Sequence, residues 1–265
     1  MGRLSDPYAG GIMQLGMVTY MWGAEWDLPT LITNCTRSGF QGIELRTTHK
    51  HGVEVTLSPD ERNRVRKQFD DSPVRFVGPG TACEFQSPDP AVVRQNIDLT
   101  KKFIVLSHDL GGSGVKVRPN GLVKVEEPAR TIDRIGKALH ECGEFAAGYG
   151  QEVRVEVHGT GTSDLAVMKQ IIDAAGHDSV LVCWNSNAGE TVDGSVAKSF
   201  NRVRTKLGRT VHIHDLYDDY PYRELFALLR KQDYDGYCLS ESPTTADPLR
   251  VMRYYRLLFD ELNRE

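Results

Sequence analysis

The sequence predicts a single α/β domain folded as a (β/α)₈ barrel, and three observations support this. Its 265 residues are 40% hydrophobic and 26% charged, which is typical of one large globular domain. Short β-branched runs alternate eight times with helix-like stretches, as expected for βαβ units around a parallel sheet. The first strand is not followed by a GxGxxG turn, which is common in doubly wound open sheets. Eight units without that turn favour the closed barrel.

Each expected strand is a short apolar run, and a helix-like stretch follows each of them. We expect the strands at residues 15–19, 42–45, 75–78, 114–118, 153–157, 180–183, 211–214 and 236–239. We expect the helices at residues 28–37, from about 58 onward, and at 88–109, 128–147, 165–175, 195–207, 222–231 and 248–262. Ser58 is a good N-cap for the second helix, because Glu61 follows three residues later as in a capping box. Residues 1–14 are expected to form an N-terminal extension, and residues 15–265 the single barrel domain.

Composition argues against several classes of function. The chain carries 32 Lys+Arg against 36 Asp+Glu, a formal net charge of -4, so nothing suggests a basic face for nucleic acid. No apolar run approaches the roughly 20 residues of a membrane span. Residues 1–11 lack the apolar core of a signal peptide, so we expect a cytoplasmic protein, with a trimmed secretion signal left open. Five scattered cysteines without CxxC spacing argue against a disulfide scaffold and a zinc ribbon.

Polar residues gather where the last four strands end, and in such a barrel these ends carry the chemistry. They are Glu156 and His158, Asn185 and Asn187, His212, His214 and Asp215, and Glu241. An ionisable group in a buried parallel strand is costly unless it is paired or bound to a metal. Two glutamates and a histidine brought together here would repel each other and lose solvation without a cation. The pattern therefore predicts one divalent metal ion at the mouth of the barrel.

Taken singly, each of these residues has a plainer interpretation. Glu156 could be a charge at the barrel rim, His212 a core histidine, and Glu241 an N-cap for the following loop. The same register in four successive strands is what favours the metal site. The roles of Glu44 and Arg46, which end the second strand, stay open. These two residues either contact substrate or form an ion pair with each other.

Arg118, at the end of the fourth strand, suits a carboxylate or a polyol. A structural ion pair with Glu156 would explain Arg118 equally well.

The motifs VEVHG, VCWNSN, VHIHDL and LSES resemble those of the sugar phosphate isomerase/epimerase group of xylose isomerase-like TIM barrels, which also includes endonuclease IV. The resemblance spans the chain from Leu15 and is more specific for fold and metal than for substrate. It implies one divalent ion (Mn²⁺, Co²⁺, Mg²⁺ or Zn²⁺) held by Glu156, Asn185, His212 and Glu241. Asn185 stands where the group has an aspartate. Its amide oxygen can still coordinate a metal, but it brings no charge, so we expect weaker binding.

The resemblance also implies the chemistry. In the ketose epimerases of this group, the two metal-bound glutamates move protons on opposite faces of the substrate, and here these are Glu156 and Glu241. The metal polarises a carbonyl, and a glutamate removes the proton from the adjacent carbon. We therefore expect a metal-dependent sugar isomerase or epimerase. The residues expected to bind its substrate are Glu44, Arg46, Arg118, His158, Asn187, His214 and Asp215.

Other functions remain as alternatives. Loss of a β-substituent after proton removal would make the protein a lyase or dehydratase of keto-sugars or keto-glycosides. An endonuclease IV-like nuclease is disfavoured, because the stretches TACEF, VKVRPNG and NSNAG lack the additional histidines of that relative. A sugar-binding barrel without activity is also possible, since one ligand has changed. The sequence shows no phosphate-binding nest, so we expect a free or oxidised sugar, and it leaves a homo-oligomer open.

Overall fold

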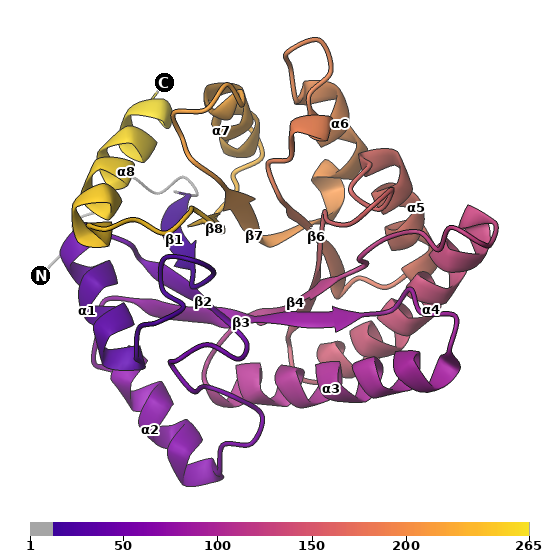
Figure 1. The fold of residues 1–265 in the computed structure, drawn as a ribbon, viewed down its shortest axis with the longest axis horizontal. Coiled ribbons are helices and arrows are strands. Elements are labelled where there is room, and N and C mark those ends of the chain that lie inside the picture. Colours follow the sequence, from indigo (N-terminus) through magenta and orange to yellow (C-terminus); the bar gives the residue numbers. More distant parts are fainter. Residues whose placement is uncertain (1–12, 265) are drawn as a thin grey trace, which may run out of the picture.

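Eight parallel strands close into a barrel in the order β1 to β8, and eight α-helices surround it in the computed structural model, which describes residues 13–264 (Figure 1). This confirms the predicted (β/α)₈ fold. The strands are β1 (Gln14–Val18), β2 (Gly42–Arg46), β3 (Arg75–Glu84), β4 (Gly114–Arg118), β5 (Glu152–Glu156), β6 (Val180–Trp184), β7 (Leu207–Ile213) and β8 (Tyr237–Ser240).

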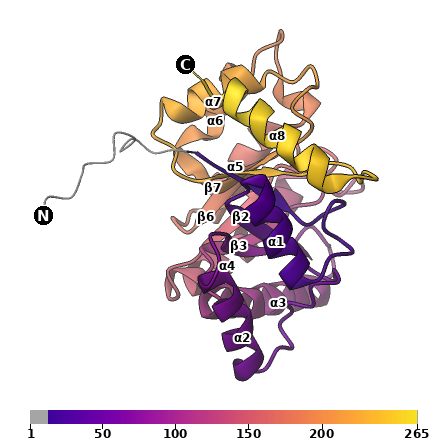
Figure 2. The ribbon, with the colours of Figure 1, turned by 90° about the vertical axis from the view of Figure 1, so that its left-hand side faces the viewer.

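The α-helices follow the strands in turn. They are α1 (Leu28–Ser38), α2 (Pro59–Asp70), α3 (Pro90–Asp109), α4 (Pro128–Ala147), α5 (Leu165–Ala175), α6 (Ala197–Val203), α7 (Tyr222–Arg230) and α8 (Pro248–Leu262). Two short 3₁₀ helices, η1 (Ala188–Glu190) and η2 (Arg204–Lys206), flank α6. The last helix, α8, packs beside α1 and so completes the outer ring (Figure 2).

Local sequence explains the start of the second helix as predicted. The Ser58 hydroxyl accepts a hydrogen bond from the Glu61 backbone N–H, and the Glu61 carboxylate accepts one from the Ser58 N–H at 2.8 Å. This reciprocal pair satisfies two N–H groups that a helix start otherwise leaves without partners.

Two strands differ from the prediction by more than one residue at an end. β3 runs on to Glu84 instead of ending at residue 78, because Gly78, Pro79 and Gly80 interrupt the apolar pattern while the backbone still pairs with β2. β7 begins at Leu207 instead of residue 211, and the predicted helix over 195–207 gives way to η2. The first residues of β7 include a glycine and an exposed arginine, so they lack the apolar character of a buried strand.

The predicted domain boundary falls largely on residues outside the described range. Of the extension expected over residues 1–14, the structure describes Met13, which is buried in the core, and Gln14, which already belongs to β1. Within residues 13–264, none of the helices combines the length and the apolar character needed to cross a membrane.

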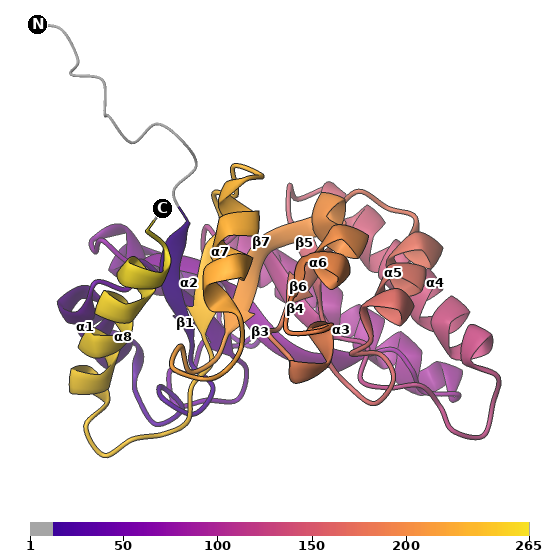
Figure 3. The ribbon, with the colours of Figure 1, turned by 90° about the horizontal axis from the view of Figure 1, so that it is seen from above.

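The main hydrophobic core lies between the barrel and its helices, and it leaves one end of the barrel free for polar side chains. This is the end at which the strands have their carboxyl termini, and the loops that follow β1 and β8 lie together there (Figure 3). In parallel strands, alternate side chains face the barrel interior. Residues at the strand ends are therefore brought to a common site.

Candidate active site

A cavity of about 590 Å³ opens at the carboxyl ends of the strands. Glu156 is the last residue of β5, and Asn185 directly follows β6. His212 is the second-last residue of β7, and Glu241 directly follows β8. Six of the seven residues predicted to bind substrate also line this cavity: Arg46, Arg118, His158, Asn187, His214 and Asp215.

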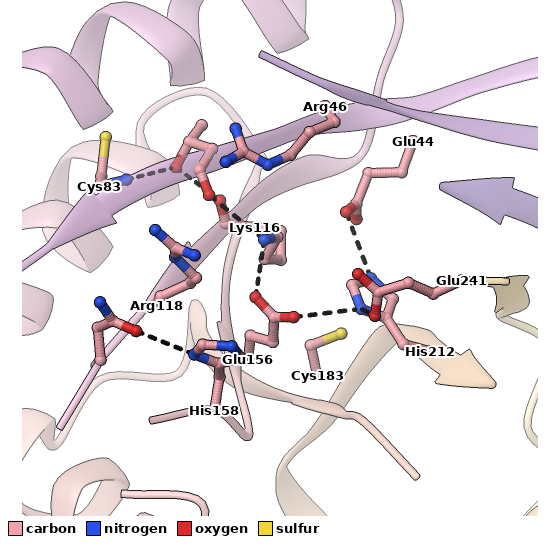
Figure 4. A network of polar contacts seen from close by, with 12 residues as sticks. Glu44, Arg46, Cys83, Lys116, Arg118, Glu156, His158, Cys183, His212 and Glu241 are labelled. Carbon is pink, nitrogen blue, oxygen red and sulfur yellow. Dashed lines mark hydrogen bonds and ion pairs between the residues drawn. The ribbon is translucent and has the colours of Figure 1, made fainter. Parts of the chain in front are cut away.

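Three of the four predicted metal ligands converge closely. Glu156, His212 and Glu241 each offer one ligand atom, and these atoms lie within 4.8 Å of one another. Nδ1 of His212 lies 3.6 Å from Oε1 of Glu156 and 3.6 Å from Oε2 of Glu241 (Figure 4). Two carboxylates and an imidazole nitrogen at this spacing form a donor set that suits a divalent ion.

Asn185, the fourth predicted ligand, lines the same cavity. The residue is 4% exposed, and its Oδ1 atom is buried without a hydrogen-bond partner. A buried amide oxygen without a donor is costly. Coordination of a cation would satisfy this oxygen, so the residues present fit a bound metal.

Glu44 occupies a different place from the one predicted. It is 1% exposed and absent from the cavity lining, and its Oε1 atom lies 3.3 Å from Nε2 of His212 (Figure 4). Arg46, its expected alternative partner, instead donates to the backbone and hydroxyl oxygens of Thr47. Gly80 makes room for Glu44, because a Cβ atom at residue 80 would lie 2.7 Å from Oε1. The position of Glu44 thus favours a contact with His212 over a contact with sugar.

Lys116 is a cavity residue that sequence reasoning left out of the site. Its Nζ atom donates to Oε2 of Glu156 at 2.7 Å and to the Thr81 carbonyl at 3.3 Å, and the side chain is 4% exposed. Burial would lower the pKa of Lys116, but the carboxylates of Glu156 and Glu44 outweigh it and raise the pKa. The sequence did contain a signal for this residue. In GVKVR, Lys116 stands two residues before Arg118 and so shares a strand face with it.

The pKa values of the ligands reflect this cluster of charges. Burial would raise the pKa of Glu156, but the charges of Lys116 and His212 lower it to about 2. Burial acts the same way on Glu241, whose pKa is held well below its ordinary value by His212 and His214. Burial lowers the pKa of His212, whereas Cys183 and Glu44 raise it, and the net direction is upward. Both glutamates are therefore ionised at neutral pH.

A second polar chain runs along the β3–β5 side of the cavity. Oε1 of Glu84 accepts hydrogen bonds from Arg118 Nη2 at 2.6 Å and from Asn120 Nδ2 at 2.7 Å. Asn120 Oδ1 in turn lies 2.9 Å from Nδ1 of His158. The structure thus pairs Arg118 with Glu84, so the alternative pairing of Arg118 with Glu156 is wrong.

The remaining predicted contacts lie on the β6–β8 side. Nε2 of His214 is 3.7 Å from Oε2 of Glu241. Asn187 donates from Nδ2 to the Val157 carbonyl at 2.7 Å and to Oε1 of Glu190 at 3.1 Å.

Glu190 was not predicted from the sequence. It is fully buried, and burial raises its pKa to about 7. Tyr220 donates to its Oε2 atom at 2.6 Å, so Glu190 anchors the loop that carries Asn187.

The sequence matches the protein family described as Xylose isomerase-like TIM barrel over residues 32–256. It is 23% identical over 250 residues to an L-ribulose 3-epimerase from Methylomonas sp. (strain DH-1), covering 87% of this chain and 84% of that protein. The fold is similar to a solved L-ribulose 3-epimerase, with a TM-score of 0.78 at 16% identity over 96% of each chain. It is also similar to 3-keto-D-glucoside 4-epimerase from E. coli, with a TM-score of 0.76 at 14% identity over 94% of this chain and 100% of that one.

Proposed function

The chain belongs to the xylose isomerase-like TIM barrel family, and from this premise we propose that it is a metal-dependent sugar epimerase or isomerase. It would act by moving a proton on the carbon next to a carbonyl. The observation that carries the proposal is the convergence of Glu156, His212 and Glu241 within 4.8 Å at a polar cavity. The buried, unpartnered Oδ1 of Asn185 adds a fourth donor.

The proposed ligands are Glu156, Asn185, His212 and Glu241, and their mixed oxygen and nitrogen donors suit Mn²⁺, Co²⁺, Mg²⁺ or Zn²⁺. When bound, such an ion polarises a carbonyl and stabilises the negative charge that develops on its oxygen. Lys116 lies beside this donor set, and its ammonium group donates to one oxygen of Glu156. Lys116 and the uncharged Asn185 act in the same direction, because both leave less negative charge for a divalent ion than three free carboxylates would.

Glu156 and Glu241 are the proposed proton carriers. Their pKa values are lowered, so both are ionised at neutral pH and able to accept a proton. Both line the cavity, from β5 and from the end of β8. One of them, ionised, would remove the proton from the substrate carbon. The other would first take up a proton from water and then deliver it to that carbon, as general acid–base catalysis requires. Return on the opposite face inverts the carbon, which is epimerisation.

The similar proteins support this step. One is named as an epimerase of L-ribulose at carbon 3, and another as an epimerase of a 3-keto-glucoside at carbon 4. In each of these substrates, the carbon that is inverted lies next to a keto carbon, where a proton is most easily removed. The cavity of this chain offers donors and acceptors for sugar hydroxyls from Arg46, Arg118, His158, Asn187, His214 and Asp215.

The test is proton exchange at the carbon next to the carbonyl. The protein is loaded with Mn²⁺, incubated in D₂O with L-ribulose, D-psicose, D-tagatose or a 3-keto-glucoside, and quenched. Deuterium incorporation and product identity are then read by NMR. We expect exchange together with an epimer or isomer. An unsaturated product would instead identify the eliminating lyase.

Three variants sharpen this test. Glu156→Gln and Glu241→Gln should each abolish exchange. Asp235→Asn makes the same change from carboxyl to amide at the opposite end of the barrel, before β8, and serves as the control. Full exchange rates in both glutamine variants would contradict the proposed bases.

A further inference from the structure

We infer that Glu84, acting through Asn120, holds a ring hydrogen of His158 on Nδ1, so that Nε2 of the neutral ring is the acceptor for a substrate hydroxyl in the cavity. The inference deepens the proposed sugar function and rests on it for the identity of the ligand. The position of the ring hydrogen follows from the geometry of the protein. Glu84 and Asn120 thereby become positioning residues for the site.

The first step concerns the orientation of the Asn120 amide. Oε1 of Glu84 receives two groups, Arg118 Nη2 at 2.6 Å and the Asn120 side chain at 2.7 Å. A carboxylate paired with a guanidinium accepts hydrogen bonds and has none to donate. The amide group that faces Glu84 must therefore be the NH₂ of Asn120, which leaves Oδ1 on the other side.

The second step concerns the proton on His158. Oδ1 of Asn120 lies 2.9 Å from Nδ1 of His158, and an amide oxygen can only accept. Nδ1 must then carry the hydrogen. A neutral imidazole carries one N–H, so Nε2 is left as an acceptor. His158 lines the cavity beside Glu156 (Figure 4).

The third step concerns what this acceptor recognises. The cavity lining includes Arg46, Lys116 and Arg118, which offer only donors, together with acceptors such as Asn187 and Asp215. Oε2 of Glu156 is already engaged by Lys116. His158 adds to this lining an acceptor whose ring hydrogen is held on the other nitrogen. A hydroxyl group can donate to Nε2, whereas a carbonyl oxygen or a hydrogen at that position cannot. The wall thus favours a substrate that keeps a hydroxyl there over its deoxy or doubly oxidised analogue.

The protein carries its own reference signals for a direct test by NMR. Nδ1 of His140 lies 2.6 Å from the Ala175 carbonyl, so that ring has its hydrogen on Nδ1. Nε2 of His51 lies 2.8 Å from the Arg46 carbonyl, while its Nδ1 accepts from the Val53 N–H, so that ring has the opposite form.

The measurement is a long-range ¹H–¹⁵N correlation on protein labelled with ¹⁵N-histidine. It uses the metal-free protein and the protein loaded with Zn²⁺, which avoids the broadening that Mn²⁺ would cause. The His158 signal is assigned as the one lost in His158→Gln. We expect it to match the pattern of His140. A pattern like that of His51, or a ring protonated on both nitrogens at pH 7.5, overturns the inference.

One variant tests the role of the anchor. Asn120 has a φ of 57°, which glycine adopts without cost, so Asn120→Gly removes the side chain and preserves the turn. In this variant His158 should show a mixture of both forms, while His140 and His51 keep their signals. An unchanged His158 signal in Asn120→Gly contradicts the inference.

Kinetics then link the ring to the substrate. With L-ribulose in D₂O, Asn120→Gly should lower kcat/KM for deuterium exchange by about 10- to 100-fold, the scale of one lost hydrogen bond to a substrate hydroxyl. An unaffected kcat/KM in Asn120→Gly argues against the substrate contact. If no sugar exchanges with the unaltered protein, the proposed function fails. The NMR result still decides the state of His158.

Discussion

Oε1 of Glu44 lies 3.3 Å from Nε2 of His212, although the two residues come from strands β2 and β7, which do not pair with each other. A carboxylate beside one nitrogen of a metal-binding histidine favours the ring hydrogen there and leaves the other nitrogen to the metal. The other nitrogen of His212 is Nδ1, which lies 3.6 Å from Glu156 and 3.6 Å from Glu241 and would bind the proposed metal. We therefore expect Glu44 to orient His212 for that metal.

Replacing Glu44 should weaken the metal site without touching any ligand. In Glu44→Gln the side chain keeps its size but loses the charge that orients His212. We expect the Mn²⁺ affinity, measured by isothermal titration calorimetry, to fall about 10- to 100-fold, as is usual for carboxylates behind metal-binding histidines. Glu152→Gln, at the amino end of β5, is the control. Equal affinities in the two variants would remove Glu44 from this role.

Asn185 should limit how tightly the metal binds. Asn185→Asp adds a third carboxylate to the ligand set and should increase the affinity for Mn²⁺, because a charged oxygen is a stronger donor than an amide oxygen. Asn185→Ala removes the buried Oδ1 atom and should reduce the affinity. Titrations of both variants against the same ion decide the point. If neither differs from the unaltered protein, Asn185 is not a ligand.

Lys116 should matter most when no metal is bound. Lys116→Met leaves Glu156 buried without its cation, which costs about 3–5 kcal/mol in comparable buried pairs. Added Mn²⁺ supplies positive charge at the same place. The rise in Tm on adding Mn²⁺ should therefore be larger in Lys116→Met than in the unaltered protein.

Lys101→Met is the matched control, because Lys101 pairs with Glu141 on the helical surface. That variant should show the same rise in Tm as the unaltered protein. A rise in Lys116→Met no larger than this would contradict the charge argument.

Glu190 should make stability depend on pH. Burial raises its pKa from 4.5 to about 7 in the folded state. Below about pH 4.5 the Glu190 carboxyl is neutral in both the folded and the unfolded protein, so the free energy of unfolding has its full value. Between about pH 4.5 and about pH 7 the carboxyl ionises only in the unfolded protein, and the free energy of unfolding falls by up to about 3 kcal/mol.

The variant Glu190→Gln lacks this titration. Thermal or urea unfolding at pH 5 and pH 8 should show that the stability of Glu190→Gln relative to the unaltered protein increases toward pH 8. A difference that is the same at both pH values would show that Glu190 ionises normally in the folded protein.

Much of the fold could be predicted because apolar periodicity and capping residues are local signals. The predicted strand over residues 114–118 and the helices over 128–147, 165–175 and 248–262 coincide with the structure. The start of β7 was missed because Gly208 and Arg209 hide it, and the end of β3 was missed because of its glycines and proline. In both, pairing with neighbouring strands overrides a weak local pattern.

The site was predictable where a charged residue stood in an otherwise buried strand, as with Glu156 and His212. It was less predictable where the meaning of a residue depends on a distant partner. Lys116 was left out of the predicted site because its pairing with Glu156 depends on how two neighbouring strands lie in the barrel. The same holds for Glu84, which acts on His158 only through Asn120.

The proposed metal donors all come from β5 to β8, whereas Tyr20, Met21 and Arg46 reach the cavity from β2 and the loop after β1. The loop over residues 19–27, which carries Tyr20 and Met21, can therefore change in length and chemistry without altering the donor atoms. Libraries confined to this loop are the first choice for changing which substrates the cavity accepts.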